Sequence, residues 1–400
     1  MSAVPQQAID VLPASPVLRP RPVRLRGPGR LLGVDAWRGL ALVLMSLDHA
    51  AYYAGSHIQA EHFADFPSEL PVWGFRLVGL ITNLAAPTFW LVSGVSIALL
   101  IPSLRIRGGG EWAVTRYLWI RAGCLALLDV AVVPWLWSKP PVPTYEYSFG
   151  LLSSFAVSLI LISGLRFLRL RYFMAVSIAL VIGYQWLAGI ITPAMLKDWG
   201  LASSLWTRYG TPGHTPHTLG VPFPVLGWFG LMGCGYVFGK RLYADRGRHP
   251  RHWAALGLGL LATWLVVRVL RSYGNTVPIS YHGDWSELIT MYKGPVSLAF
   301  LCFNAGWGCL GFALLLRLSR QLSDRPLRWL VALGQASLFT FIAHLLVYRT
   351  LGRIELKFMP HAEVFRYATT FIAGLALLVP MARWYAGLKR RHPRSVLQYL

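Results

Sequence analysis

The chain has 400 residues, of which 55% are hydrophobic and only 14% are charged, with a mean hydropathy of +0.49. Soluble globular proteins carry roughly 25% charged residues, and one soluble core could not enclose this much apolar surface. The formal net charge of +22 would suggest nucleic-acid binding in a soluble protein, but here the basic residues lie in short clusters between long apolar runs. The composition therefore indicates a polytopic membrane protein and no nucleic-acid partner.

The chain begins with a segment rich in Pro and Arg, residues 1–29, which contains no apolar run. It is therefore neither a signal peptide nor part of a core, and we expect a disordered, basic cytoplasmic tail. A transmembrane domain over residues 30–388 follows, and residues 389–400 form a second basic cytoplasmic tail.

Apolar runs long enough to cross a bilayer, about 20 residues each, recur along the rest of the chain. They predict an all-α fold with about ten transmembrane helices, at 32–54, 75–101, 113–137, 148–165, 172–192, 222–240, 252–270, 294–316, 327–351 and 364–386.

The basic residues indicate the orientation of these helices. Most Lys and Arg residues lie in the two tails and in the even-numbered connections between the predicted spans. Cytoplasmic loops carry this excess in membrane proteins. We therefore expect a multi-pass protein of the cell (inner) membrane, with the lipid bilayer as a partner and both termini in the cytoplasm.

The four cysteines all lie inside apolar runs, and their spacing predicts neither a disulfide framework nor a zinc site. His214 and His217 have a spacing compatible with a metal ion, but Pro216 stands between them and no Cys or Glu is near. We expect no metal.

The first predicted helix carries the strongest functional signal. Arg38 and His49 are eleven positions apart, about three helical turns, so both side chains project from one face about 16 Å apart along the axis. Asp35 lies one turn before Arg38 and can pair with it, and Asp48 precedes His49. Ionisable residues inside a span are costly and therefore candidate functional groups. The alternative is a pair of helix-end anchors.

Most of the eleven histidines fall in or beside the outward connections, among them His49, His57 and His62. An imidazole titrates near neutral pH and suits proton transfer. The alternative is that connecting loops simply carry polar residues.

Three further polar positions lie within predicted spans. Asn83 precedes Pro87, which interrupts the backbone hydrogen bonds and leaves a carbonyl unpaired, so either a substrate-facing kink or a simple helix distortion is expected. Asp129 could orient an imidazole on another helix or pair with an Arg. His344 lies in an apolar helix, where a hydrogen-bonded structural role and a catalytic role both remain open.

The string VDAWRGLALVLMSLDHA (34–50) resembles the first helix of the transmembrane acyltransferase superfamily, and its Arg-to-His spacing is similar to that of the acyltransferase type 3 families. NLAAPTFWLVSGVSIAL (83–99) resembles the second helix of the heparan-alpha-glucosaminide N-acetyltransferase catalytic-domain-like family of bacterial membrane proteins. Weaker likeness continues through residues 228–239, 292–301 and 334–347. The block at Tyr292 departs from that family's Tyr-Pro-Pro-Ser, and the essential histidine of heparan-acting relatives lies in the loop that holds His57 and His62.

The resemblance implies an acyltransferase that moves an acyl group, acetyl by expectation, from cytosolic acyl-CoA (acetyl-CoA) to a hydroxyl or amine of an outward-facing glycan-like or lipid-linked acceptor. The general base is one of His49, His57 and His62, of which the shared face favours His49. Asp48 or Asp129 would fix its tautomer. Acyl-CoA is the co-substrate, and homo-oligomerisation is left open.

The predicted substrate-binding residues are Asp35, Arg38, Asn83, Asp129, Tyr292 and His344. Arg105, Arg107 and Arg116 are expected to join Arg38 as anchors for the CoA phosphates. The alternative function is a transporter or lipid-handling protein that uses the same intramembrane ionisable residues.

Overall fold

The computed structural model describes residues 31–56, 72–106, 110–137, 149–190, 223–244, 249–275, 286–289, 291, 296–318, 327–392 and 395–399. Within these ranges the chain forms helices and turns, with no strand. The predicted all-α fold is thus confirmed. The predicted N-terminal tail, the pair His214 and His217, and the candidate residues His57, His62 and Tyr292 lie outside the described ranges.

Every one of the ten predicted apolar ranges contains helix, although the boundaries shift. The helices are α1 (Leu32–Tyr53), α2 (Val72–Thr82), α3 (Ala85–Ile106), α4 (Glu111–Ala131), α5 (Val133–Trp137), α6 (Leu151–Leu165), α7 (Leu170–Ile190), α9 (Val225–Ala244), α10 (Pro250–Leu270), α11 (Ser286–Ile289), α12 (Leu298–Arg317), α13 (Arg328–Gln335), α14 (Ser337–Phe358) and α15 (Glu363–Arg391).

Six helical segments among the described residues are long and apolar enough to cross a membrane, and a seventh is added if α13 and α14 count as one bent span. This supports a multi-pass membrane protein, but the predicted number of about ten spans is not confirmed. Helix α1 is not among the six. It carries Asp35, Arg38 and Asp48, and 13 of its 22 residues are buried, so its surroundings are protein side chains more than lipid.

Three predicted spans are interrupted, of which 113–137 divides into α4 and α5 at Val132. The range 327–351 bends by 96° between α13 and α14, because Ala336 leaves the helical conformation (φ −111°, ψ 34°). The range 75–101 consists of α2 and α3, separated by a turn at Asn83 and Leu84. Pro87 therefore stands in the first turn of α3, where its missing N–H removes no helix bond. The interruption lies at Asn83 and Leu84, three to four residues before Pro87, and Pro87 has no N–H to donate to the carbonyl oxygen of Asn83.

Close helix packing fixes α1 against α13. A Cβ atom at Gly39 would lie 2.0 Å from the carbonyl oxygen of Leu330, and one at Gly334 would lie 1.7 Å from that of Asp35. Gly94 and Gly235 bring α3 and α9 together in the same way. Small residues allow such backbone contact within membranes, so the sequences around Arg38 and Gln335 meet at a fixed register.

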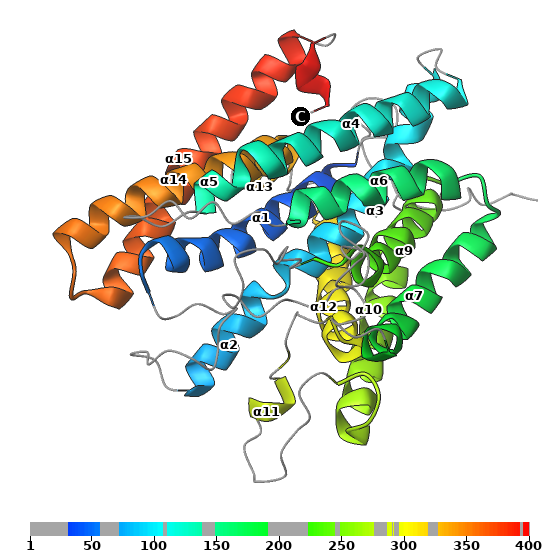
Figure 1. Ribbon diagram of the computed structural model, residues 1–400, viewed down its shortest axis with the longest axis horizontal. Coiled ribbons are helices and arrows are strands. Elements are labelled where there is room, and N and C mark those ends of the chain that lie inside the picture. The colour runs from blue at the N-terminus through cyan, green and yellow to red at the C-terminus, as the bar shows by residue number, and fades with distance from the viewer. Residues whose placement is uncertain are drawn as a thin grey trace, which may run out of the picture.

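Figure 1 shows α1 in the interior of the bundle, while α7 lies at its right-hand edge and α10 lies lower down beside α12. Helices α14 and α15 run side by side toward the left, where α1 also ends, and the C-terminus lies above α13. The N-terminal half of α1 and the C-terminal part of α15 therefore point toward one end of the bundle, and the turn between α14 and α15 lies at the other end.

Candidate active site

Two histidines from distant parts of the sequence meet inside the bundle. Nδ1 of His49 on α1 lies 2.6 Å from Nε2 of His344 on α14. The two rings stack with their centroids 4.8 Å apart and an interplanar angle of 18°. His344 is 1% exposed and His49 is 8% exposed. The pair is thus enclosed by protein, with His49 nearer its surface.

The hydrogen bonds of His344 determine the tautomers of both rings. Its Nδ1 lies within hydrogen-bond distance of the carbonyl oxygen of Phe341, and a carbonyl only accepts, so Nδ1 carries the proton. Nε2 of neutral His344 is then an acceptor, and Nδ1–H of His49 donates to it. It follows that the lone pair of His49 lies on Nε2. That nitrogen can take up a proton, and the resulting imidazolium keeps its bond to His344.

Aromatic side chains surround the pair. The ring of Trp137, at the end of α5, stands edge-on to His49 with centroids 4.8 Å apart. Tyr52 and Tyr53 pack against Trp137 and donate hydrogen bonds to the backbone carbonyls of Trp137 and Leu136. These contacts hold α5 over the end of α1 and exclude water from one side of the imidazole.

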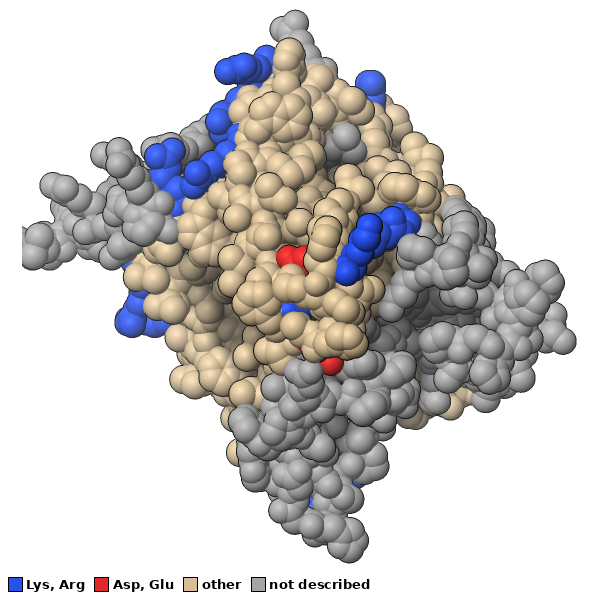
Figure 2. All heavy atoms as spheres, turned by 90° about the vertical axis from the view of Figure 1, so that its left-hand side faces the viewer, with Lys and Arg blue, Asp and Glu red and all other residues tan. Residues whose placement is uncertain are grey.

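Polar contacts tie the end of α1 to the turn between α14 and α15. The buried Arg366 side chain donates from Nε to the carbonyl oxygen of Ala54, and from Nη1 to those of Met359 and Pro360. Ser56 donates to Glu363 at 2.7 Å. Because His49 lies just over one turn before Ala54, these bonds fix its position relative to α14. Figure 2 views this end of the bundle, where the described surface is largely uncharged.

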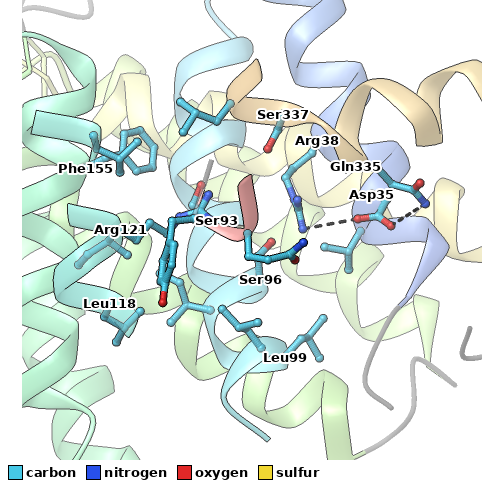
Figure 3. A pocket seen from close by; sticks show the side chains of 18 of the residues that line it. Asp35, Arg38, Ser93, Ser96, Leu99, Leu118, Arg121, Phe155, Gln335 and Ser337 are labelled. Carbon is cyan, nitrogen blue, oxygen red and sulfur yellow. Dashed lines mark hydrogen bonds and ion pairs between the residues drawn. The ribbon is translucent and has the colours of Figure 1, made fainter. Parts of the chain in front are cut away.

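A cavity of about 680 Å³ lies between α1, α3, α4, α6, α14 and α15. Arg38 and Arg121 lie on opposite sides of it, with Ser93 and Ser96 of α3 between them (Figure 3). Leu118, Leu125, Leu152 and Phe155 supply apolar walls. The cavity therefore offers cationic, hydroxyl and apolar surfaces to a single ligand.

Arg38 is held at the cavity wall by fixed partners. Its Nη2 lies 3.5 Å from Oδ1 of Asp35, and its Nη1 donates to the carbonyl oxygen of Gly334 at 3.1 Å. Gln335 donates to Oδ2 of Asp35 at 3.4 Å (Figure 3). Since the Arg38 side chain retains 22% of its exposure, it is oriented by protein and still open to a ligand. The predicted pairing of Asp35 with Arg38 is confirmed.

The C-terminal segment completes the cavity. Lys389 and Arg390 on α15 line it together with Gln398 and Tyr399. Tyr117 of α4 donates to the carbonyl oxygen of Gln398 at 3.0 Å, and the Gln398 amide donates to the carbonyl oxygen of Lys389 at 2.9 Å. Helix α15 continues to Arg391, so Lys389 and Arg390, which the sequence assigns to a cytoplasmic tail, are helical and line the cavity.

The cavity leads toward the histidine pair along one face of α14. Ser337 and Phe341 line the cavity, and His344 follows one turn later on the same face. The carbonyl group of Phe341 is also the acceptor for His344. On α1, Arg38 at the cavity and His49 in the pair both face the unit formed by α13 and α14. The predicted shared face of Arg38 and His49 is therefore present in the structure.

Other predicted residues lie apart from the pair. Asp129 is buried and accepts hydrogen bonds from the backbone N–H groups of Gly150 and Ser153, so it caps the first turn of α6. Asn83 lies half-buried in the turn between α2 and α3, where its N–H donates to Gly79. Asp48 interacts electrostatically with Tyr367 on α15. The contact to Nδ1 of His49 that fixes its tautomer comes from His344.

Two of the predicted phosphate anchors do not line the cavity. Arg105 forms an ion pair with Glu111, and Arg116 is exposed on another face of α4. Arg107 lies outside the described residues. The basic residues that line the cavity besides Arg38 are Arg121 on α4 and Lys389 and Arg390 on α15.

Within the described ranges, no group of three or more His, Cys, Asp or Glu side chains could hold a metal ion. The two imidazoles of the histidine pair are hydrogen-bonded to each other, and an imidazole with an available lone pair can accept a proton or act as a nucleophile.

Residues 31–383 match the family model of the acyltransferase domain of type 3. The chain belongs to this family. The match covers α1 and most of α15, and so includes both histidines and Arg38. It shows a membrane acyltransferase and favours an enzyme over the transporter alternative, but it does not extend to the narrower heparan-alpha-glucosaminide N-acetyltransferase-like family. No curated protein matches the chain.

Proposed function

We propose that this acyltransferase moves an acyl group, acetyl in the simplest case, from cytosolic acyl-CoA to a hydroxyl or amine of an outward-facing glycan-like or lipid-linked acceptor. The observation that carries the proposal is the position of the His49–His344 pair on α1 and α14. The same faces of these two helices line a cationic cavity nearer the start of each helix. The family supports acyl transfer in general, and the donor, the acceptor and the base are our inference.

The proposed topology has ten spans in the cell (inner) membrane with both termini in the cytoplasm. Under this topology the start of α1, the end of α3, the start of α4 and the end of α15 lie on the cytoplasmic side. All four contribute to the cavity, so the cavity would face the compartment that contains acyl-CoA. His49 would lie toward the outer side, which is where an outward-facing acceptor is available.

The cavity suits the donor. Arg38, Arg121, Lys389 and Arg390 provide four positive charges against the single carboxylate of Asp35. Phosphate groups pair well with such side chains, and arginine can bind them with two parallel hydrogen bonds. With the phosphates held at this end, an extended pantetheine arm would run along α1 and α14 toward the pair. Arg38 and His49 are about 16 Å apart along the helix.

The histidine pair suits the chemistry. Nε2 of His49 would remove the proton of the acceptor hydroxyl or amine as that group attacks the thioester carbonyl carbon. The carbon–sulfur bond then breaks, and the proton passes from His49 to the departing CoA thiolate. His344 would stabilise the transient imidazolium through the Nδ1–H bond. A route through an acyl-imidazole would use the same Nε2 lone pair.

The test is a transfer assay with the purified full-length protein in nanodiscs and acetyl-CoA labelled in the acetyl group. We expect release of CoA. When a lipid extract or a glycan extract is added as the acceptor, we also expect transfer of the labelled acetyl group to it. Release of CoA that stays at the level of empty nanodiscs, across acetyl and longer acyl donors, would contradict the proposed donor.

A further inference from the structure

A second charged cluster lies outside the cavity, where α3 and α6 end and α4 begins. One carboxylate, Glu111, bridges two guanidinium groups, with Oε1 2.5 Å from Nη2 of Arg105 and Oε2 3.2 Å from Nη2 of Arg166. Arg166 also donates to the carbonyl oxygen of Glu111 and to Oγ1 of Thr115. Both carboxylate oxygens are therefore already used by the two arginines.

Lys240 on α9 adds a third positive charge. Its Nζ lies 5.6 Å from the centre of the Tyr236 ring, and it is close enough to Arg105, Arg166 and Glu111 to interact with all of them electrostatically. Three cations thus surround one carboxylate, which leaves two positive charges in excess. Like charges held together in this way favour the binding of an anion.

Arg166 gives a second, independent sign of a ligand. Its side chain is only 2% exposed, yet neither its Nε nor its Nη1 has a hydrogen-bond partner among the residues described. A buried N–H group without an acceptor is costly. Burial lowers the pKa of the Arg166 guanidinium, and the Glu111 carboxylate opposes that effect. An anion with several oxygens would both satisfy the two nitrogens and stabilise the charge.

The surroundings of the cluster match the surface of a bilayer. Trp112 on α4 is 68% exposed, and Phe167 and Leu168, which follow Arg166, are also exposed. Exposed Trp and apolar side chains next to basic groups are typical of the level of the lipid head groups. The proposed topology places this end in the cytoplasm, where anionic lipids are enriched.

We propose that Arg105, Arg166 and Lys240 bind a phosphate group, and that its source is the head group of an anionic phospholipid. The phosphate oxygens would accept from Nε and Nη1 of Arg166 and from the half-exposed Arg105, while the acyl chains pack beside Phe167 and Leu168. The site is separate from the donor cavity, whose lining includes none of these residues.

The experiment measures the melting temperature of the purified full-length protein in detergent with added phosphatidylglycerol, phosphatidylcholine of the same chain length, or inorganic phosphate. We expect phosphatidylglycerol to raise the melting temperature in a saturable way and the other two to have little effect. Equal protection by phosphatidylcholine would overturn the site. Equal protection by inorganic phosphate would overturn the lipid source in favour of a free phosphate.

Variants locate the effect. Arg105→Gln and Lys240→Gln should each weaken the apparent affinity for phosphatidylglycerol about fivefold, since one basic residue near the membrane surface contributes about that factor. Lys240→Gln keeps the bridge between Glu111 and both arginines, so it tests the site even if Arg105→Gln folds poorly. Arg171→Gln is the matched control, because Arg171 is exposed at the start of α7, a few residues after Arg166, and stacks on Tyr172. An equal loss in Arg171→Gln would show unspecific attraction and contradict the proposal.

Discussion

Replacing His344 tests whether the histidine pair works as a unit. In His344→Phe the ring remains but the acceptor for Nδ1–H of His49 is lost, so neither the tautomer nor the imidazolium is stabilised. A hydrogen bond to a charged group contributes about 1.5–3 kcal/mol, and about 1.36 kcal/mol corresponds to a tenfold change in rate. If this bond strengthens in the transition state, kcat should fall about 10- to 150-fold while KM for acyl-CoA changes little.

His344→Gln provides the matched comparison. The Gln side-chain oxygen can occupy the place of Nε2 and accept from His49, so this variant should keep more activity than His344→Phe. His361→Phe, in the exposed turn before α15, should leave turnover unchanged. Labelled acetyl transfer and thermal unfolding are measured for all three variants. A His344→Phe protein that is folded and turns over within twofold of the unaltered protein would refute the role of the pair.

Three further changes test the cavity, the packing and the topology. Arg38→Lys keeps the charge but loses the planar guanidinium group, so KM for acyl-CoA should rise while kcat is largely kept. Unchanged KM values in both Arg38→Lys and Arg38→Ala would exclude a role of Arg38 in donor binding. Gly39→Ala places a Cβ 2.0 Å from a carbonyl oxygen of α13 and should cost roughly 1–3 kcal/mol of stability, measured by thermal unfolding. Gly183→Ala, where the new Cβ has open space, is the control and should be neutral or slightly stabilising. A reporter fused after Arg394 should lie in the cytoplasm, and a periplasmic reporter would reverse the proposed orientation.

Local patterns in the sequence predict much of the fold. The helical content follows from apolar runs of span length, and the shared face of Arg38 and His49 follows from the 3.6-residue period. The break at Ala336 does not, and it lies next to Gly334, which packs directly against the backbone of α1. A hydropathy profile contains no information about such a contact.

The site was predicted only in part for the same reason. His49 and His344 are 295 positions apart, and a single sequence does not show which distant residues meet. The sequence therefore does not distinguish a structural from a catalytic role for His344. For Lys389 and Arg390 the sequence predicts a cytoplasmic tail, because a basic chain end usually marks orientation. Their place in the cavity depends on the return of α15 to α4 through Gln398 and Tyr117.

The most direct test of the account is the turnover of His49→Ala. A positioned general base contributes typically about 10²- to 10⁴-fold, so labelled acetyl transfer should fall by that factor, while acyl-CoA binding, measured by equilibrium dialysis, and thermal stability should be kept. His57→Ala and His62→Ala, from the segment after α1, should remain active. A His49→Ala protein that transfers acetyl normally, with activity lost instead in His57→Ala or His62→Ala, would contradict the assignment of the base to the histidine pair.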